Sequence, residues 1–98
     1  MSLPLILLDE AKAEFDDSHD WYENQQVGLG ARFNAAIRGV LALIRKNPLR
    51  FPVVYKDVRK ATVPVFPFRI YYAVEEDRIL VTCVFHTSRD PAIWQGRR

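Results

Sequence analysis

Residues 66–86 decide the fold of this chain, and they read FPFRIYYAVEEDRILVTCVFH. Two runs of β-branched and aromatic residues lie on either side of a short polar break at Glu75–Arg78. Such runs, separated by a polar break, predict two antiparallel strands joined as a β-hairpin. We therefore expect this segment to form the centre of a sheet.

The register of this hairpin predicts which side chains share a face. With an even-numbered loop, position 75 pairs with 78, so that Arg69 lies opposite Val84 and His86 lies opposite Pro67. Arg69 and His86 would then share one face, within reach of a common ligand. The other face would be continuous core, formed by Ile70, Tyr72, Val74, Ile79, Val81, Cys83 and Phe85.

Helical spacing comes before the hairpin. Asp9 is a candidate cap for an acidic helix whose apolar stripe follows Ala11, Phe15, Ser18 and Tyr22. A second helical pattern runs from Leu29 to Ile44 and ends at Asn47-Pro48, because the residue before proline is disfavoured in a helix. The glycines at 28 and 30 are expected in the turn, so that the two helices form an antiparallel hairpin.

The remaining segments complete an α+β domain. Leu3–Leu8 is expected as an edge strand, Leu49–Tyr55 as an extended connection, and Val58–Val63 as a strand. A helical turn should follow Asp90-Pro91, and Gly96–Arg98 should fray. The predicted order is β-α-α-β-β-β, a single domain over residues 1–98 in which the helical hairpin covers one face of a mainly antiparallel sheet.

The net charge of +2 hides an asymmetry. Residues 1–26 carry seven acids and one lysine, a charge of −6, whereas residues 27–98 carry thirteen bases and five acids, a charge of +8. The basic part could meet a phosphate backbone or an acidic protein, or it could simply be solvated. The lone cysteine, Cys83, is expected to be a buried thiol, and neither a membrane span nor a metal-ligand spacing is visible.

The candidate functional residues are basic. Arg59 and Lys60 lie on one expected strand, Arg69 on the next, and His86 and Arg89 at the end of the last. Arginines with a histidine could stabilise a scissile phosphate and move the proton of a 2′-hydroxyl. Alternatively, Arg69 pairs with an acid across the sheet and His86 is an ordinary residue at a strand end.

Short motifs follow one another along the chain: Asp20-Trp21-Tyr22-Glu23, Gly28-Leu29-Gly30 with Arg32-Phe33, Asn47-Pro48, Phe51–Tyr55, Val58–Ala61, Phe66–Tyr72 and Phe85–Pro91. In this order they resemble the RelE/ParE superfamily of bacterial toxins, and specifically its ParE-like plasmid-stabilisation branch. Together they span nearly the whole chain.

The resemblance implies a small toxin without a cofactor, neutralised by an antitoxin, with operator DNA bound only through the antitoxin. The hydrophobic content of 49% predicts an apolar groove on the helical hairpin and the sheet edge that the antitoxin covers, and a free toxin that forms a homo-oligomer. Without a membrane span or a signal peptide in the pattern, we expect a cytoplasmic protein. ParE-like members inhibit DNA gyrase, which is the reading we favour here. The target would then meet Arg59, Lys60, Arg89 and Trp94.

RelE-like members instead cut messenger RNA on the ribosome without a metal. Under that alternative, Arg69 and His86 would be catalytic. The chain departs from the RelE pattern in having few lysines before the hairpin, and Trp94 where those enzymes often have a tyrosine.

Overall fold

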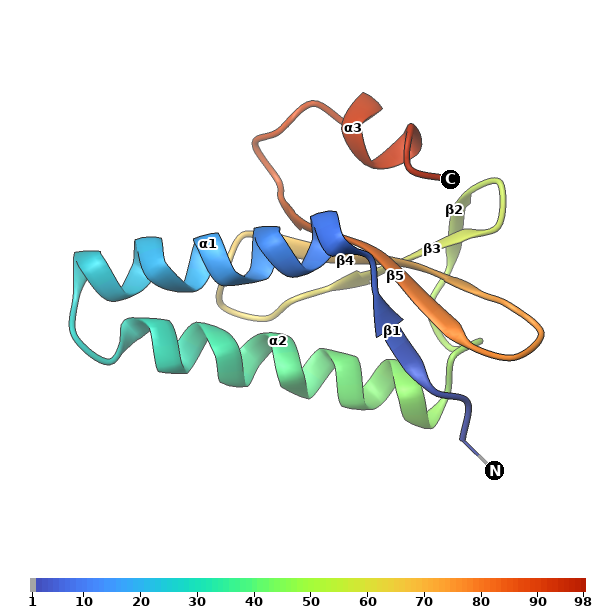
Figure 1. The fold of residues 1–98 in the computed structure, drawn as a ribbon, viewed down its shortest axis with the longest axis horizontal. Coiled ribbons are helices and arrows are strands. Elements are labelled where there is room, and N and C mark those ends of the chain that lie inside the picture. Colours follow the sequence, from blue (N-terminus) through green and yellow to red (C-terminus); the bar gives the residue numbers. More distant parts are fainter. Residues whose placement is uncertain (1) are drawn as a thin grey trace.

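The computed structural model describes residues 2–98, which form two layers with a short third layer (Figure 1). A five-stranded sheet has the order β1-β5-β4-β3-β2, in which β1 is parallel to β5 and the other neighbours are antiparallel. The strands are β1 (Leu5–Leu7), β2 (Val53–Tyr55), β3 (Val58–Thr62), β4 (Phe68–Val74) and β5 (Ile79–His86). The predicted α+β class, with a helical hairpin against a mainly antiparallel sheet, is confirmed.

Two long helices form the predicted hairpin. Helix α1 (Asp9–Gln25) and helix α2 (Leu29–Lys46) are joined at Gly28, whose φ of +89° favours glycine. The Glu23 carboxylate accepts the backbone N–H groups of Gly28 and Gly30. The turn is therefore held by a side chain of the first helix. The prediction that Asp9 caps the helix was wrong. Asp9 is the first residue of the helix, the N-cap residue is Leu8, and no side chain makes a capping hydrogen bond there.

The segment before β3 and the segment after β5 agree with the predictions only in part. Val53–Tyr55 forms the edge strand β2 rather than an unpaired connection, since it pairs with β3. Helix α3 (Ala92–Gln95) follows Asp90, whose Oδ1 accepts the N–H of Ala92, as the sequence predicted. The last two residues do not fray, because Arg97 and Arg98 both make ion pairs with the domain.

A β-bulge interrupts the central hairpin. Near the loop, Val74 pairs with Ile79 and Tyr72 with Val81, in the predicted register. Beyond Tyr72 the partners shift by one residue, and Thr82 is the extra residue on β5. A shift of one residue turns every later side chain to the opposite face.

The sheet consequently separates two hydrophobic clusters. The larger lies between the sheet and the helical hairpin and includes Phe33, Ile37, Ile44, Phe68, Ile70, Tyr72, Ile79, Val81 and Val84. The smaller lies on the other face and contains Val58, Tyr71, Cys83, Phe85 and Trp94. The prediction of one continuous core face was thus wrong for Cys83 and Phe85. Among residues 2–98, no helix is both long and apolar enough to cross a membrane.

Candidate functional site

Arg69 and His86 lie on opposite faces of the sheet. Past the bulge, Arg69 pairs with Phe85 and His86 pairs with Phe68. Arg69 therefore lies on the face that carries Phe85 and the smaller cluster, while His86 lies on the face of the helical hairpin, with its ring edge-on to Phe68 at 5.1 Å. The expectation that Arg69 and His86 share a face is corrected by this register.

The His86 ring is oriented by its own turn. Its Nδ1 accepts the backbone N–H of Ser88 at 3.0 Å and lies 2.7 Å from the Ser88 hydroxyl. Because a backbone N–H can only donate, Nδ1 must be the accepting nitrogen, and the neutral ring carries its proton on Nε2. The imidazole is thus prepared to donate from Nε2 rather than to act as a base at Nδ1.

A groove runs between α1 and the ends of β4 and β5. Two adjoining hollows, of about 400 and 290 Å³, share Ser18, Phe68 and His86 as walls. Trp21 lines the larger hollow and is 58% exposed, which makes it a prominent exposed aromatic side chain. Sequence reasoning did not select Trp21, although its place off the apolar stripe of α1 indicated exposure.

Glu14 organises the inner end of this groove. Its carboxylate accepts the backbone N–H of Val84 at 3.1 Å, on the edge of β5 that β1 no longer covers. The same carboxylate pairs with Arg89 and with Arg97, while its side chain is only 12% exposed. Arg89 also lies 5.3 Å from the Phe85 ring centre. Arg89 is therefore partly neutralised, and its position is determined by Glu14.

Arg59 and Lys60 take separate roles because neighbouring residues of a strand face opposite sides. Arg59 donates from Nη1 to the carbonyl oxygens of Leu49 and Phe51, and so stabilises the segment that leads into β2. Lys60 pairs with Tyr71, on the same face as Arg69. Lys60 and Arg69 thus share the face opposite the helices, at half-buried positions, whereas His86 and Arg89 line the smaller hollow on the side of α1.

Trp94 belongs to the interior. It is 7% exposed, and its indole stacks on the Tyr71 ring with 4.1 Å between centroids and a 9° angle between planes. Tyr55 meets it edge-on. In this structure Trp94 offers no exposed ring to a target.

Comparison with known proteins agrees with this architecture. The family model described as "ParE toxin of type II toxin-antitoxin system, parDE" matches residues 5–91, from β1 to the end of the β5 turn. The chain belongs to the ParE toxin family. No curated protein matches the chain.

A solved structure shares the fold of this toxin. It is described as the "Chromosomal ParDE TA system from P. aeruginosa" and superposes with a TM-score of 0.65 at 16% identity. The match covers 88% of the toxin and 97% of that chain. At this identity the likeness concerns the fold.

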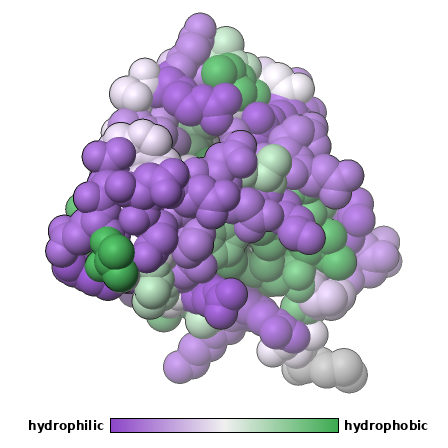
Figure 2. All heavy atoms as spheres, turned by 60° about the vertical axis from the view of Figure 1, so that its left-hand side comes forward, coloured by the Kyte–Doolittle hydropathy of each residue, from purple (hydrophilic) through white to green (hydrophobic). Residues whose placement is uncertain are grey.

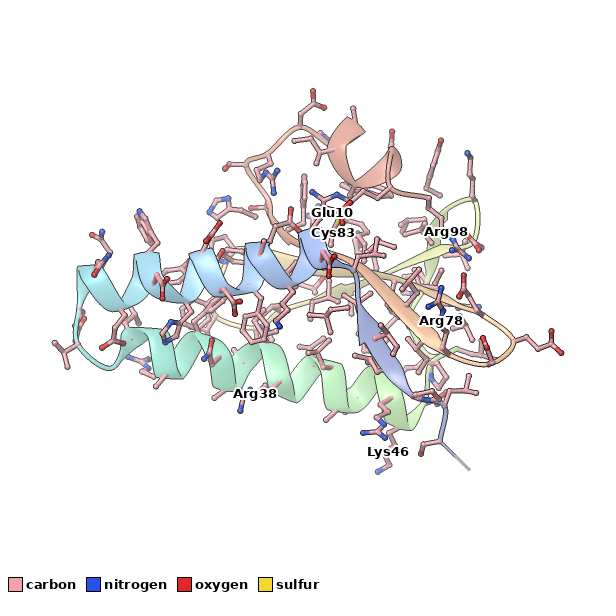
Figure 3. All side chains as sticks on the ribbon, in the orientation of Figure 1. Glu10, Arg38, Lys46, Arg78, Cys83 and Arg98 are labelled. Atoms are coloured by element: carbon pink, nitrogen blue, oxygen red, sulfur yellow. The ribbon has the colours of Figure 1, made fainter. Side chains whose placement is uncertain are left out.

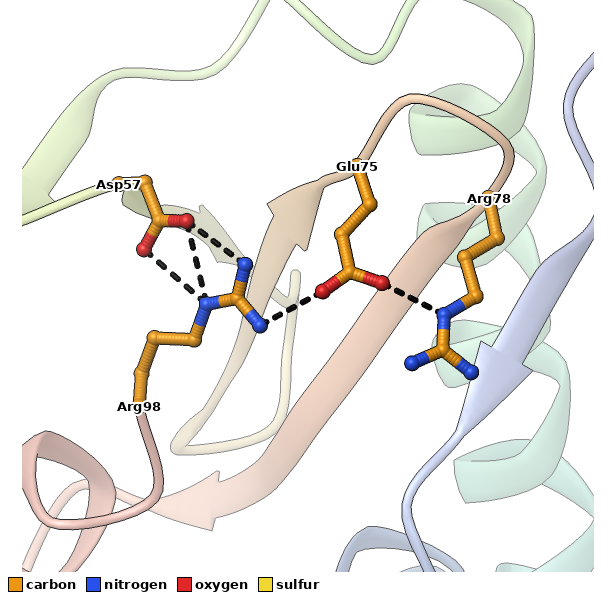
Figure 4. Close-up of polar contacts among 4 residues, drawn as sticks. All are labelled: Asp57, Glu75, Arg78 and Arg98. Carbon is orange, nitrogen blue, oxygen red and sulfur yellow. Dashed lines mark hydrogen bonds and ion pairs between the residues drawn. The ribbon is translucent and has the colours of Figure 1, made fainter.

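The last residue of the toxin forms ion pairs with two loops of the sheet. Arg98 binds Asp57 in the β2–β3 turn and Glu75 in the β4–β5 loop, and Glu75 also binds Arg78 (Figure 4). Hydrogen bonds from Arg98 lower the pKa of Asp57, and those from Arg78 and then Arg98 lower the pKa of Glu75. The C-terminal residues therefore belong to the face of the sheet opposite the helical hairpin.

Cys83 is a structural residue of the toxin. Its side chain is fully buried in the smaller cluster, and burial raises the pKa of the thiol to about 11. A thiol that is buried and protonated is a poor nucleophile. Within residues 2–98, no group of three or more histidine, cysteine or acidic side chains is placed to hold a metal ion.

A second groove of the toxin lies between α2 and β3. A hollow of about 480 Å³ is walled by Gly39, Leu43, Phe51 and Pro64, with Arg50 at its rim. Leu43 is 42% exposed, and a Cβ at Gly39 would meet nothing within 4 Å. Figure 2 shows a mainly hydrophilic surface in which hydrophobic side chains gather in separate patches. An apolar groove is thus available on the helical hairpin.

Proposed function

We propose that this ParE-family toxin acts in the cytoplasm by binding DNA gyrase directly, and that it does not cleave messenger RNA. The observation that carries this choice is the separation of Arg69 from His86 by the thickness of the sheet. Metal-independent RNA cleavage needs a charge stabiliser and a proton-transfer group at the same phosphate. Here the two candidates point away from each other, which favours inhibition by contact.

The proposed contact surface is the groove between α1 and the strand ends. Binding energy at protein interfaces is concentrated in a few residues, and tryptophan and arginine are enriched among them. Trp21 at the mouth of the groove and Arg89 at its inner end offer both types. Trp21 thus takes the anchoring role that the sequence suggested for the buried Trp94.

The antitoxin would cover the other groove, between α2 and β3. Its apolar walls and the neighbouring Arg50 suit an amphipathic segment that carries acidic residues. Sequence-specific operator recognition would belong to the antitoxin. Without the antitoxin, the exposed Leu43 and Leu49 favour self-association of the toxin, which sedimentation of the free protein would detect.

The decisive experiment compares two assays on the same purified variants. The wild-type toxin should block supercoiling by gyrase, or trap cleaved DNA, while leaving messenger RNA intact in a translating extract. Trp21→Ala should weaken gyrase inhibition by about tenfold or more, as expected for an anchor worth over 1.4 kcal/mol. Val54→Ala, at an exposed residue of the edge strand β2, serves as the control and should inhibit like the wild type.

The opposite outcome is equally clear. Cleavage of messenger RNA by the wild type, lost by about 10² or more in a folded Arg69→Ala or His86→Ala protein, would establish the RelE-like mechanism. Gyrase inhibition that is unaffected by Trp21→Ala would leave the target in place but refute the groove as its contact.

A further inference from the structure

We propose that the outward face of α2 binds the phosphate backbone of duplex DNA, independently of base sequence. Arg38, Arg45 and Lys46 lie on this face, and Figure 3 shows Arg38 and Lys46 projecting from α2 away from the sheet. All three side chains are exposed. The inference concerns this surface alone and holds whichever target the toxin inhibits.

The first argument is an acid-free tract. No Asp or Glu occurs between Glu23 and Asp57. The tract nevertheless holds six bases: Arg32, Arg38, Arg45, Lys46, Arg50 and Lys56. Over the part of the chain that the structure describes, no ion pair links any of these six to an acid. The positive charge on α2 is thus not balanced locally.

Helix stability explains only part of this pattern. Arg45 and Lys46 lie in the last turn of α2, where cations favour the helix dipole. Arg38 lies near the middle of the helix, where the dipole gives no such benefit. The row from Arg38 to Arg45 spans seven residues, or about 10.5 Å along the axis. Long flexible arms at this spacing can reach phosphates on the two sides of a DNA groove about 6 to 12 Å wide.

The residues between the cations favour phosphate over an acidic protein segment. On this face the small side chain of Ala42 lies between Arg38 and Arg45, so that a phosphate backbone can approach closely, and the neighbouring Leu5 and Leu41 are half-buried. The exposed Leu43 faces the antitoxin groove instead. A recess of about 570 Å³ beside Arg45 and Lys46, lined also by Ser2, adds room and a hydroxyl donor.

The neighbouring helix limits how DNA can approach. Helix α1 carries seven acids and one lysine, a charge of −6, and lies alongside α2. Phosphates are repelled from that side and attracted to the outer side of α2. Duplex DNA should therefore bind along the outer side of α2.

The test measures binding of the purified toxin to a short random-sequence DNA duplex by fluorescence anisotropy at several salt concentrations. Three phosphate contacts predict a slope of about −2.7 in log K against log salt, or an affinity loss of about twentyfold between roughly 50 and 150 mM salt. The triple variant R38Q/R45Q/K46Q should lose most of this affinity and most of the slope. The matched triple K12Q/K56Q/K60Q removes the same charge away from α2 and should keep both the affinity and the slope, with circular dichroism showing that both variants are folded.

Three outcomes would overturn the proposal. The wild type could fail to bind the duplex at low salt, or the two triple variants could lose affinity equally, which would indicate net charge alone. Polyglutamate that displaces the duplex and binds more tightly at equal charge would show that the surface reads an acidic protein.

Discussion

On its inner face the sheet packs against Phe33 and a set of aromatic rings, whereas its outer face is closed by Trp94 and two arginines at the end of the chain. The inner closure is apolar and continuous with both long helices. On the outer face the Trp94 indole stacks on the sheet. The two C-terminal arginines then hold this segment in place through ion pairs with Glu14, Asp57 and Glu75. Apolar burial is little affected by ionic screening or by pH, whereas ion pairs weaken with both, so the stability that the outer face contributes should depend more strongly on these conditions.

The largest effect should come from the inner face. Phe33 is fully buried and lies within 6.0 Å of the ring centres of Phe15, Tyr22, Phe66 and Phe68. Phe33→Ala should lower the free energy of unfolding by about 3–5 kcal/mol, because the cavity cannot close among rigid rings. Urea unfolding measures the loss. Val27→Ala, at a residue 90% exposed, should stay within about 0.5 kcal/mol of wild type.

A smaller loss should follow from the outer face. Trp94→Ala should cost about 3 kcal/mol, since the indole is buried and stacked on Tyr71. It should also expose Cys83, so that the thiol reacts faster with a disulfide reagent in the native state. The matched control is Trp21→Ala, at an indole 58% exposed, which should cost far less. Equal losses of unfolding free energy in the two tryptophan variants would mean that the packing of Trp94 in the smaller cluster does not stabilise the toxin.

The buried carboxylate that joins both faces should rank next. Glu14→Gln keeps the size of the side chain and an acceptor for the Val84 N–H, but leaves Arg89 and Arg97 without their counter-charge. We expect a loss of about 2–3 kcal/mol in urea unfolding, below the full cost of breaking a buried pair because Arg89 is 38% exposed. Glu76→Gln, in an exposed loop, is the control. If Glu14→Gln left the free energy of unfolding unchanged, the ion pairs of Glu14 would not be needed to hold the C-terminal segment.

The smallest effect should be the pH dependence of the outer ion pairs. The pKa values of Asp57 and Glu75 are lowered in the folded protein, so their contribution is complete above the ordinary values of 3.8 and 4.5 and is lost as the pH falls through the folded ones. The double variant D57N/E75Q should therefore lose stability at neutral pH and show a shallower decline below about pH 4.5. Parallel pH profiles for the double variant and the wild type would contradict this assignment.

Much of the architecture could be predicted from local patterns. The apolar stripes and the Asn47-Pro48 stop located α1 and α2, and the polar break at Glu75–Arg78 located the hairpin loop. These features depend on residues close together in the chain. Their physical cause, backbone restriction and side-chain periodicity, is visible in the sequence.

The candidate site could not be predicted in the same way. Its composition was visible, in that His86 and Arg89 do line a groove. The bulge at Thr82 was not visible, because strand alternation looks the same with one extra residue until the partner strand is known. That residue lies where β1 ends and the Glu14 carboxylate takes over the edge of β5, a contact between positions 70 residues apart.

The sequence by itself determined the helical hairpin, the central strands, the charge asymmetry and the resemblance to ParE-like toxins. Only the tertiary structure decided that Arg69 and His86 part to opposite faces, that Trp94 is buried while Trp21 is exposed, and that the last two arginines are fastened. The reason is physical: periodicity and turn chemistry act within a few residues, whereas register, burial and ion pairing are set by which distant segments the fold brings together.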